Sequence, residues 1–357
     1  MDDSSSKLIR EKILSFFYFS FLTFIGVLIV VWIYFRLGIE ETVSYILSIG
    51  TYRIILLGFL ALFNIFIFAL RWRLVLESLD KSKKNISVIS LMKIRLSCLA
   101  VSYITPGTNY GGEVVRPFLL KEELKIPFSY GLASIIIDRI VEGIALGVLL
   151  FVCSLFFLIK KSFIWAGLCL LVSLLMGFAF YLLLKKKKLS LLFYWISKMS
   201  FIQNNQNNVK QRIKSIGSAS IDFFHKSKKS DFWTCIFLEV IYFLVLGIQA
   251  QFFLGFVGKG VSLFHSLVAR IVATLGGFFP VPASIGFYEG AYSLGFSSIG
   301  VPARLGLSFS LICRFFDFIS VIFGLIFLLP YFKKVISLAF SYFLKSNGKN
   351  YFKRNQE

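Results

Sequence analysis

Long apolar runs separated by short polar loops organise this chain. Six runs are long enough to cross a membrane as helices, and they cover residues 13–35, 54–70, 130–159, 163–184, 232–256 and 305–329. Two further apolar stretches, residues 88–120 and 264–298, are interrupted by proline and glycine, which break helices. The pattern predicts an all-α polytopic membrane protein with about six full spans and two broken elements. All of residues 1–357 then form a single integral membrane domain.

The two broken stretches are predicted to be re-entrant helical hairpins, which enter and leave the membrane on the same side. Irregular backbone is tolerated at that depth only where protein buries it or where it lines a wet cavity. For the first stretch, an amphipathic loop at the membrane surface is the alternative. The predicted breaks are Pro106, Gly107, Gly111 and Gly112 in the first hairpin, and Pro280, Pro282 and Gly286 in the second.

Charged residues recur at matching distances in the two halves of the chain. A glutamate follows a proline by seven residues in both halves, and an arginine follows that glutamate by 26 residues in one half and 25 in the other. Several spacings that agree within one residue indicate an internal duplication, with one half over residues 13–159 and the other over 163–330. The matching pairs are Pro106 and Pro282, Glu113 and Glu289, Arg139 and Arg314, Glu142 and Asp317, and Arg95 and Arg270.

Composition places the chain in the membrane class, because 57% of its residues are apolar and only 16% are charged. The net charge of +21 resides mostly in short loops, so membrane topology explains it better than a nucleic-acid partner does. No cysteine or histidine has the spacing of a metal or redox site, so we expect no metal and no cofactor.

The positive loops predict the orientation in the cytoplasmic membrane. The N-terminus, residues 71–84, residues 185–231 and the tail after residue 332 should all be cytoplasmic. Residues 185–231 are interpreted as a solvated basic loop, with a helix lying on anionic headgroups as the alternative. The two halves then run in opposite senses. Such inverted-topology repeats with broken helices are typical of secondary transporters.

The charges inside the apolar segments are the candidate functional residues, because each costs about 2.5–3.5 kcal/mol at the centre of a membrane helix. Glu113 and Glu289 lie at helix breaks, where each can reach an arginine, Arg139 or Arg314, on a neighbouring segment. The i,i+3 pairs formed by Arg139 with Glu142 and by Arg314 with Asp317 share a helix face. The full set is Arg95, Glu113, Arg116, Asp138, Arg139, Glu142, Arg270, Glu289, Arg314 and Asp317.

Two interpretations of these charges remain open. They could neutralise one another and hold the hairpins in place. Alternatively, they could line a hydrated cavity between the halves that accepts a polar or phosphate-bearing headgroup, since the planar fork of arginine binds two phosphate oxygens. The glycines at the helix breaks would also let backbone N–H groups approach an anion.

The paired motif of proline, glycine, glutamate and arginine resembles the lysylphosphatidylglycerol synthase transmembrane-region family, also described as flippase-like domain proteins. The resemblance covers nearly the whole chain and is strongest over residues 95–147 and 270–325. It implies a domain that translocates a lipid, whether a phospholipid, a polyprenyl-phosphate lipid or a hopanoid. Family members such as the multiple peptide resistance factor carry a soluble aminoacyltransferase domain, which we expect to be absent here. Cys313 stands where the first half has Asp138, so the halves need not play equal roles.

The sequence therefore favours a lipid flippase or transporter that is not an enzyme. A membrane-embedded transferase acting on a lipid headgroup is the alternative, although no nucleotide-binding loop and no nucleophile–histidine pair supports it. A scaffold subunit for a separate lipid-modifying synthase is a third possibility.

Overall fold

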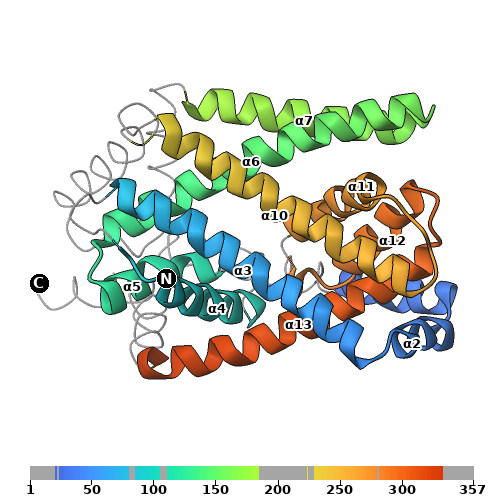
Figure 1. Cartoon of the computed structure of the whole chain (residues 1–357), viewed down its shortest axis with the longest axis horizontal. Coiled ribbons are helices and arrows are strands. Elements are labelled where there is room, and N and C mark those ends of the chain that lie inside the picture. The colour runs from blue at the N-terminus through green and yellow to red at the C-terminus, as the bar shows by residue number, and fades with distance from the viewer. Residues whose placement is uncertain are drawn as a thin grey trace, which may run out of the picture.

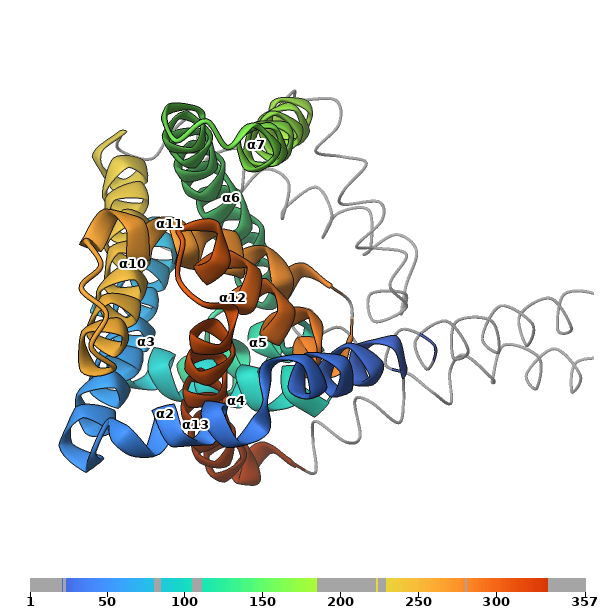
Figure 2. The ribbon, with the colours of Figure 1, turned by 90° about the vertical axis from the view of Figure 1, so that its right-hand side faces the viewer.

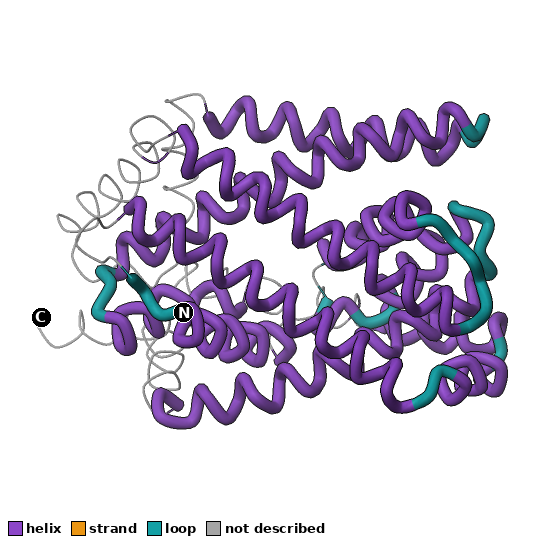
Figure 3. The backbone as a smooth tube through the Cα atoms, in the orientation of Figure 1, coloured by secondary structure: helices purple, strands orange, loops and turns teal. Residues whose placement is uncertain are grey.

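The computed structural model describes residue 21, residues 24–79, 85–104, 111–184, residue 223 and residues 229–279 and 281–332. Every regular element in these ranges is a helix (Figure 3), so the prediction of an all-α polytopic protein is confirmed. Pro106, Gly107, Pro280 and nearly all of the basic loop 185–231 lie outside the described residues.

Four long helices form the body of the molecule, and each is long and apolar enough to cross a membrane. They are α3 (Thr51–Leu79), α6 (Phe128–Ile159), α10 (Lys229–Phe256) and α13 (Ala303–Leu328). They run along the long axis of the molecule in Figure 1. They match four of the six predicted spans, and the other two overlap the shorter apolar helices Phe24–Leu37 and Phe163–Ala179.

Helix α7 (Phe163–Leu184) lies at one edge of the molecule, packed along α6 (Figures 1 and 2). Large apolar side chains such as Leu168, Leu171 and Leu174 are exposed on it. An apolar, exposed helix surface is expected of a segment that faces lipid tails rather than water. This edge of the molecule therefore faces the bilayer.

The loop predicted at residues 71–84 begins later than expected. Helix α3 continues through Arg71 and Arg73 to Leu79, since Arg71 is buried and paired. Residues 36–53, between the first two predicted spans, contain a helix, α2 (Ile39–Ser48). In Figure 2, α2 lies across the end of the long helices. Ser308 of α13 donates a hydrogen bond to the carbonyl oxygen of Thr42, at 3.3 Å.

The first broken stretch folds as a helical hairpin of α4 (Val88–Ile104) and α5 (Gly111–Leu124). Gly112 allows the two helices to meet, because a Cβ at this position would lie 2.0 Å from the carbonyl oxygen of Cys98. The backbone N–H of Gly112 donates to the Ser102 hydroxyl at 2.9 Å. The two short helices therefore pack closely against each other at Gly112.

The second broken stretch is also a hairpin. It comprises α11 (Leu263–Thr274), the 3₁₀ turns η2 (Leu275–Phe278) and η3 (Pro282–Ser284), and α12 (Phe287–Ser298). Gly286 directly precedes α12 with φ at 82°, a left-handed conformation that glycine adopts without steric cost. In Figure 1 the α11–α12 hairpin and the α4–α5 hairpin lie toward opposite ends of the long helices. An inverted arrangement requires this placement, although the repeat layout itself stays a prediction.

Side-specific labelling tests this topology. We expect single cysteines at Asn85 and Lys125, on the two sides of the first hairpin, to be labelled only from the cytoplasm. Cysteines at Glu40 and Lys259 should be labelled only from outside. All four native side chains are exposed, whereas the five native cysteines are buried, so background labelling should be low. If residues 85 and 125 are labelled from opposite faces, the first hairpin is a full span and the inverted arrangement is wrong.

Candidate functional site

A cavity of about 350 Å³, here called the central cavity, lies among the long helices and both hairpins. Helices α3, α4 and α6 of the first half of the sequence duplication form part of its wall. Helices α10, α11, α12 and α13 of the second half form the rest. Within an otherwise apolar bundle, its lining is strongly charged. The charged lining residues are Arg71, Arg95, Arg139, Arg270, Arg314, Glu142, Glu239 and Asp317.

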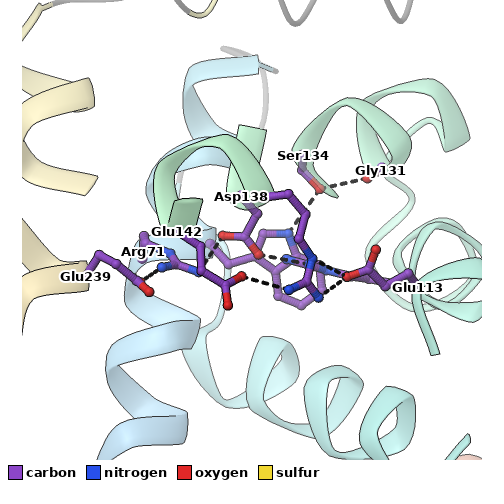
Figure 4. A network of polar contacts seen from close by, with 10 residues as sticks. Arg71, Glu113, Gly131, Ser134, Asp138, Glu142 and Glu239 are labelled. Carbon is purple, nitrogen blue, oxygen red and sulfur yellow. Dashed lines mark hydrogen bonds and ion pairs between the residues drawn. The ribbon is translucent and has the colours of Figure 1, made fainter. Parts of the chain in front are cut away.

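A buried ionic network joins α3, α5, α6 and α10 beside this cavity (Figure 4). Asp138 forms ion pairs with Arg71 at 2.8 Å and with Arg116 at 2.9 Å. Arg71 also pairs with Glu239. All four side chains are less than 5% exposed. The guanidinium group of Arg116 additionally stacks on Trp72, 3.8 Å from the ring centroid. Two arginines and two carboxylates thus balance one another out of contact with solvent.

The sequence pattern predicts Asp138 and Arg116 as candidate functional residues, but not Arg71 or Glu239. Four other basic residues follow Arg71 closely, which is typical of a basic loop. A signal for Glu239 was available, since it is the only charged residue in the run 232–256. A lone carboxylate in a membrane helix requires a partner.

A second ionic cluster connects the first hairpin to α6. Arg139 donates from Nε to Glu113 at 2.7 Å and from Nη1 to Glu142 at 2.7 Å. The predicted i,i+3 pair is therefore formed, and the hairpin glutamate reaches the arginine of the next span. Arg139 is 34% exposed and Glu142 is 30% exposed, so this cluster is open to the cavity.

The second hairpin repeats this contact. Arg314 of α13 donates from Nε to Glu289 of α12 at 2.8 Å. The other oxygen of Glu289 accepts the backbone N–H of Gly286 at 2.8 Å. Each hairpin glutamate therefore binds the arginine that follows it by 25 or 26 residues, as the spacing indicated. The backbone N–H groups of Gly112 and Gly286 are both occupied, so these two glycines do not offer them to an anion.

Asp317 does not pair directly with Arg314, contrary to the i,i+3 expectation. The hydroxyl of Tyr103 donates to Asp317 at 2.8 Å and accepts from Arg314 at 3.4 Å. Tyr103 comes from α4, so its hydroxyl ties the first hairpin to the last long helix. Nothing in the spacing pattern identified Tyr103, since the second half has Phe279 at the matching distance before its glutamate.

Arg95 and Arg270 occupy matching positions in the two hairpins, and both line the central cavity. Among the described residues, neither has a carboxylate partner. The guanidinium group of Arg95 lies 4.3 Å from the ring centroid of Phe68. That of Arg270 lies 4.8 Å from the ring centroid of Tyr292. These two cations differ from the other arginines of the cavity, which are held by acidic side chains.

The described part of the chain holds no group of three or more histidine, cysteine, aspartate or glutamate side chains placed to bind a metal ion. The five cysteines are free and buried. The chemistry that the site offers is therefore that of arginine, carboxylate and tyrosine hydroxyl groups around a small cavity.

Comparison with known proteins agrees with this architecture. The family model of the lysylphosphatidylglycerol synthase TM region matches residues 20–324. A UPF0104 membrane protein of Methanothermobacter thermautotrophicus is 25% identical over 88% of this chain and 94% of its own length. A UPF0104 membrane protein of Pyrococcus horikoshii is 23% identical over 83% of this chain and 92% of its own length. No solved structure matches the chain.

Proposed function

Since this chain belongs to the lysylphosphatidylglycerol synthase transmembrane-region family, we propose that it moves a lipid with a polar or phosphate-bearing headgroup across the cytoplasmic membrane. In this proposal both termini lie in the cytoplasm. The lipid is a phospholipid, a polyprenyl-phosphate lipid or a hopanoid, and the headgroup crosses through the central cavity. The acyl chains stay in the bilayer while the headgroup crosses.

The central cavity is the observation that carries this proposal. Five arginines and three carboxylates line it, although each charge is costly inside a membrane. Polar and ionisable groups at membrane depth usually face a wet cavity and mark a substrate pathway. The volume of about 350 Å³ falls in the range of ligand pockets, about 300–1,000 Å³. A lipid headgroup is a polar ligand that arrives from within the membrane.

The two hairpins support a transport mechanism. Transporter sites lie at the interface between repeats, where discontinuous helices meet, and alternating access comes from rocking one repeat against the other. Here each hairpin is joined to the following long helix by one glutamate–arginine contact. The Tyr103 hydroxyl links the first hairpin to α13. These polar contacts connect the hairpins to the long helices that such a movement would shift.

Transbilayer movement in proteoliposomes tests the proposal. Headgroup-labelled phosphatidylglycerol, a labelled polyprenyl phosphate and a labelled hopanoid are each incorporated, and the label that a membrane-impermeant quencher reaches is followed with time. We expect faster movement of at least one lipid than in protein-free liposomes. If instead the recovered lipid has a changed mass, the protein is a transferase. If all three lipids move at the protein-free rate, the flippase proposal fails.

A variant that fills the central cavity tests whether the headgroup crosses there. Ala61 lines the central cavity on α3, and Ala61→Trp inserts an indole there. We expect a transport rate at least about tenfold lower, which corresponds to about 1.4 kcal/mol in the barrier. Ala179→Trp, on the exposed surface of α7, adds the same group facing lipid and should leave the rate unchanged. Equal rates in both variants would exclude the cavity as the headgroup path.

A further inference from the structure

We propose that the central cavity binds a phosphate group and that Arg95 and Arg270, one from each hairpin, are its cationic ligands. This inference rests on the proposed function and specifies its substrate as a phosphate-bearing lipid. It divides the arginines of the cavity into two sets, those that hold the protein together and those that bind the ligand.

The first set is defined by its carboxylate partners. Arg71 pairs with Asp138 and Glu239, Arg139 with Glu113 and Glu142, and Arg314 with Glu289. A guanidinium group already neutralised in this way attracts a further anion weakly. These contacts connect neighbouring helices, so their first role is to stabilise the fold.

The second set is Arg95 and Arg270. The side chain of Arg270 lies inside the protein, and the residue is 6% exposed. Its Nε and Nη1 atoms have no hydrogen-bond partner among the described residues. Unlike the other buried arginines with unsatisfied N–H groups, it has no carboxylate partner there. The rings of Tyr292 and Phe309, at 4.8 and 5.5 Å, replace only part of the hydration that it loses. A buried cation without a counter-ion is strongly unfavourable, so an anionic ligand would relieve a cost that the empty protein carries.

Arg95 supplies the second cation. It lines the same cavity and stacks on Phe68, which orients its guanidinium group without neutralising it. Arg95 precedes the first hairpin glutamate by 18 residues, and Arg270 precedes the second by 19. Each half of the molecule therefore contributes to the cavity one arginine that has no carboxylate partner among the residues that the structure describes.

The remaining charges of the cavity do not oppose an anion strongly. Its three carboxylates each have a donor among the described residues: Glu142 has Arg139, Glu239 has Arg71, and Asp317 has the Tyr103 hydroxyl. Two arginines present paired N–H donors, which match the oxygens of a phosphate better than those of a neutral sugar or alcohol. A phosphate group, whether from a lipid or free in solution, is thus the ligand chemistry that fits.

Thermal unfolding of the ligand-free protein in detergent provides the first test. Removing a cation that has no carboxylate partner among the described residues should relieve its desolvation cost, which is larger for the buried Arg270 than for the half-buried Arg95. Arg270→Gln and Arg95→Gln should therefore melt at the wild-type temperature or above. Arg139→Gln, which leaves Glu113 and Glu142 without their partner, should melt lower. Lower melting of Arg95→Gln and Arg270→Gln in the absence of ligand would assign both arginines a structural role and overturn the proposal.

Binding measurements provide the second test. The probes are dihexanoylphosphatidylglycerol, dihexanoylglycerol with the same chains but no phosphate, and inorganic phosphate. We expect the wild type to bind the phosphate lipid more tightly than dihexanoylglycerol. Each of Arg95→Gln and Arg270→Gln should weaken that affinity about tenfold or more, since a hydrogen bond to a charged group is lost. Arg53→Gln is the control, because Arg53 also stacks on an aromatic ring but does not line the cavity.

The outcomes separate this inference from the proposed function. If inorganic phosphate binds as tightly as the lipid and competes with it, the anion site stands but serves a soluble anion. If the wild type moves lipid in proteoliposomes while both variants bind the phosphate lipid with wild-type affinity, the protein is a transporter and the anion site is wrong. Equal wild-type affinity for dihexanoylglycerol and dihexanoylphosphatidylglycerol would also overturn it.

Discussion

Asp138→Asn should destabilise the protein by about 3–5 kcal/mol, as expected when one member of a buried ionic network is removed and its partners remain charged. Asp138 binds both Arg71 and Arg116. Without it, Arg116 keeps its contacts with the rings of Trp72 and Phe68 but has no carboxylate partner among the described residues, and the network carries one uncompensated positive charge. The measurement is the thermal unfolding of Asp138→Asn and of the wild type in detergent.

Two control variants decide whether charge balance is the cause. Glu142→Gln removes a carboxylate that is 30% exposed and leaves Arg139 paired with Glu113, so its cost should be small. The double variant Asp138→Asn with Arg116→Gln removes one charge of each sign and should recover much of the lost stability. A double variant as unstable as Asp138→Asn would contradict the account of this network as a balanced ionic cluster.

Gly324→Ala should also destabilise the protein strongly, although alanine favours helices over glycine by about 1 kcal/mol. Gly324 lies in α13, where it crosses α4. A Cβ there would lie 2.1 Å from the carbonyl oxygen of Leu96 and 2.6 Å from its carbon. Backbone atoms of a packed helix cannot move aside as a flexible side chain can. Overpacking of this kind costs about 1–3 kcal/mol, occasionally more.

Gly255→Ala is the matched control for this prediction. Gly255 lies in α10, and a Cβ there meets no atom within 4 Å. The Gly255→Ala variant should therefore be more stable than the wild type, because alanine has the higher helix propensity, whereas Gly324→Ala should be less stable. Thermal melting of the two variants in the same detergent tests the contrast in sign. Equal or raised melting temperatures for both would show that α4 and α13 do not pack as closely as described.

The spacing pattern predicted the contacts that both halves share. Glu113 with Arg139 and Glu289 with Arg314 form in both hairpins, because the same chain length separates each hairpin helix from the helix that follows. The hairpins themselves were predictable from proline and glycine in apolar runs. These features depend on local sequence, and they therefore appear in the sequence of each half separately.

The contacts that differ between the two halves of the molecule were not predictable from the sequence. Tyr103 reaches Asp317 from a helix 214 positions away in the sequence, and Phe279 at the corresponding position lacks the hydroxyl. Arg71 joins α3 to α6 and α10, although its neighbours in sequence suggested a solvated loop. Both residues acquire partners only when distant helices pack together, which no periodicity within one helix reveals. Helix α2 was missed for a related reason, since its charged residues resemble those of a loop.

Photo-crosslinking from within the central cavity tests the central claim most directly. A benzophenone side chain is placed at Leu246, which lines the cavity on α10, and at Leu171, which is 55% exposed on α7. After irradiation in the native membrane, the attached molecules are identified by mass spectrometry. The account predicts a lipid adduct at Leu246 that is enriched in one phosphate-bearing class, whereas adducts at Leu171 follow the bulk lipid composition. The absence of lipid at Leu246, or the same bulk composition at both positions, would contradict the account.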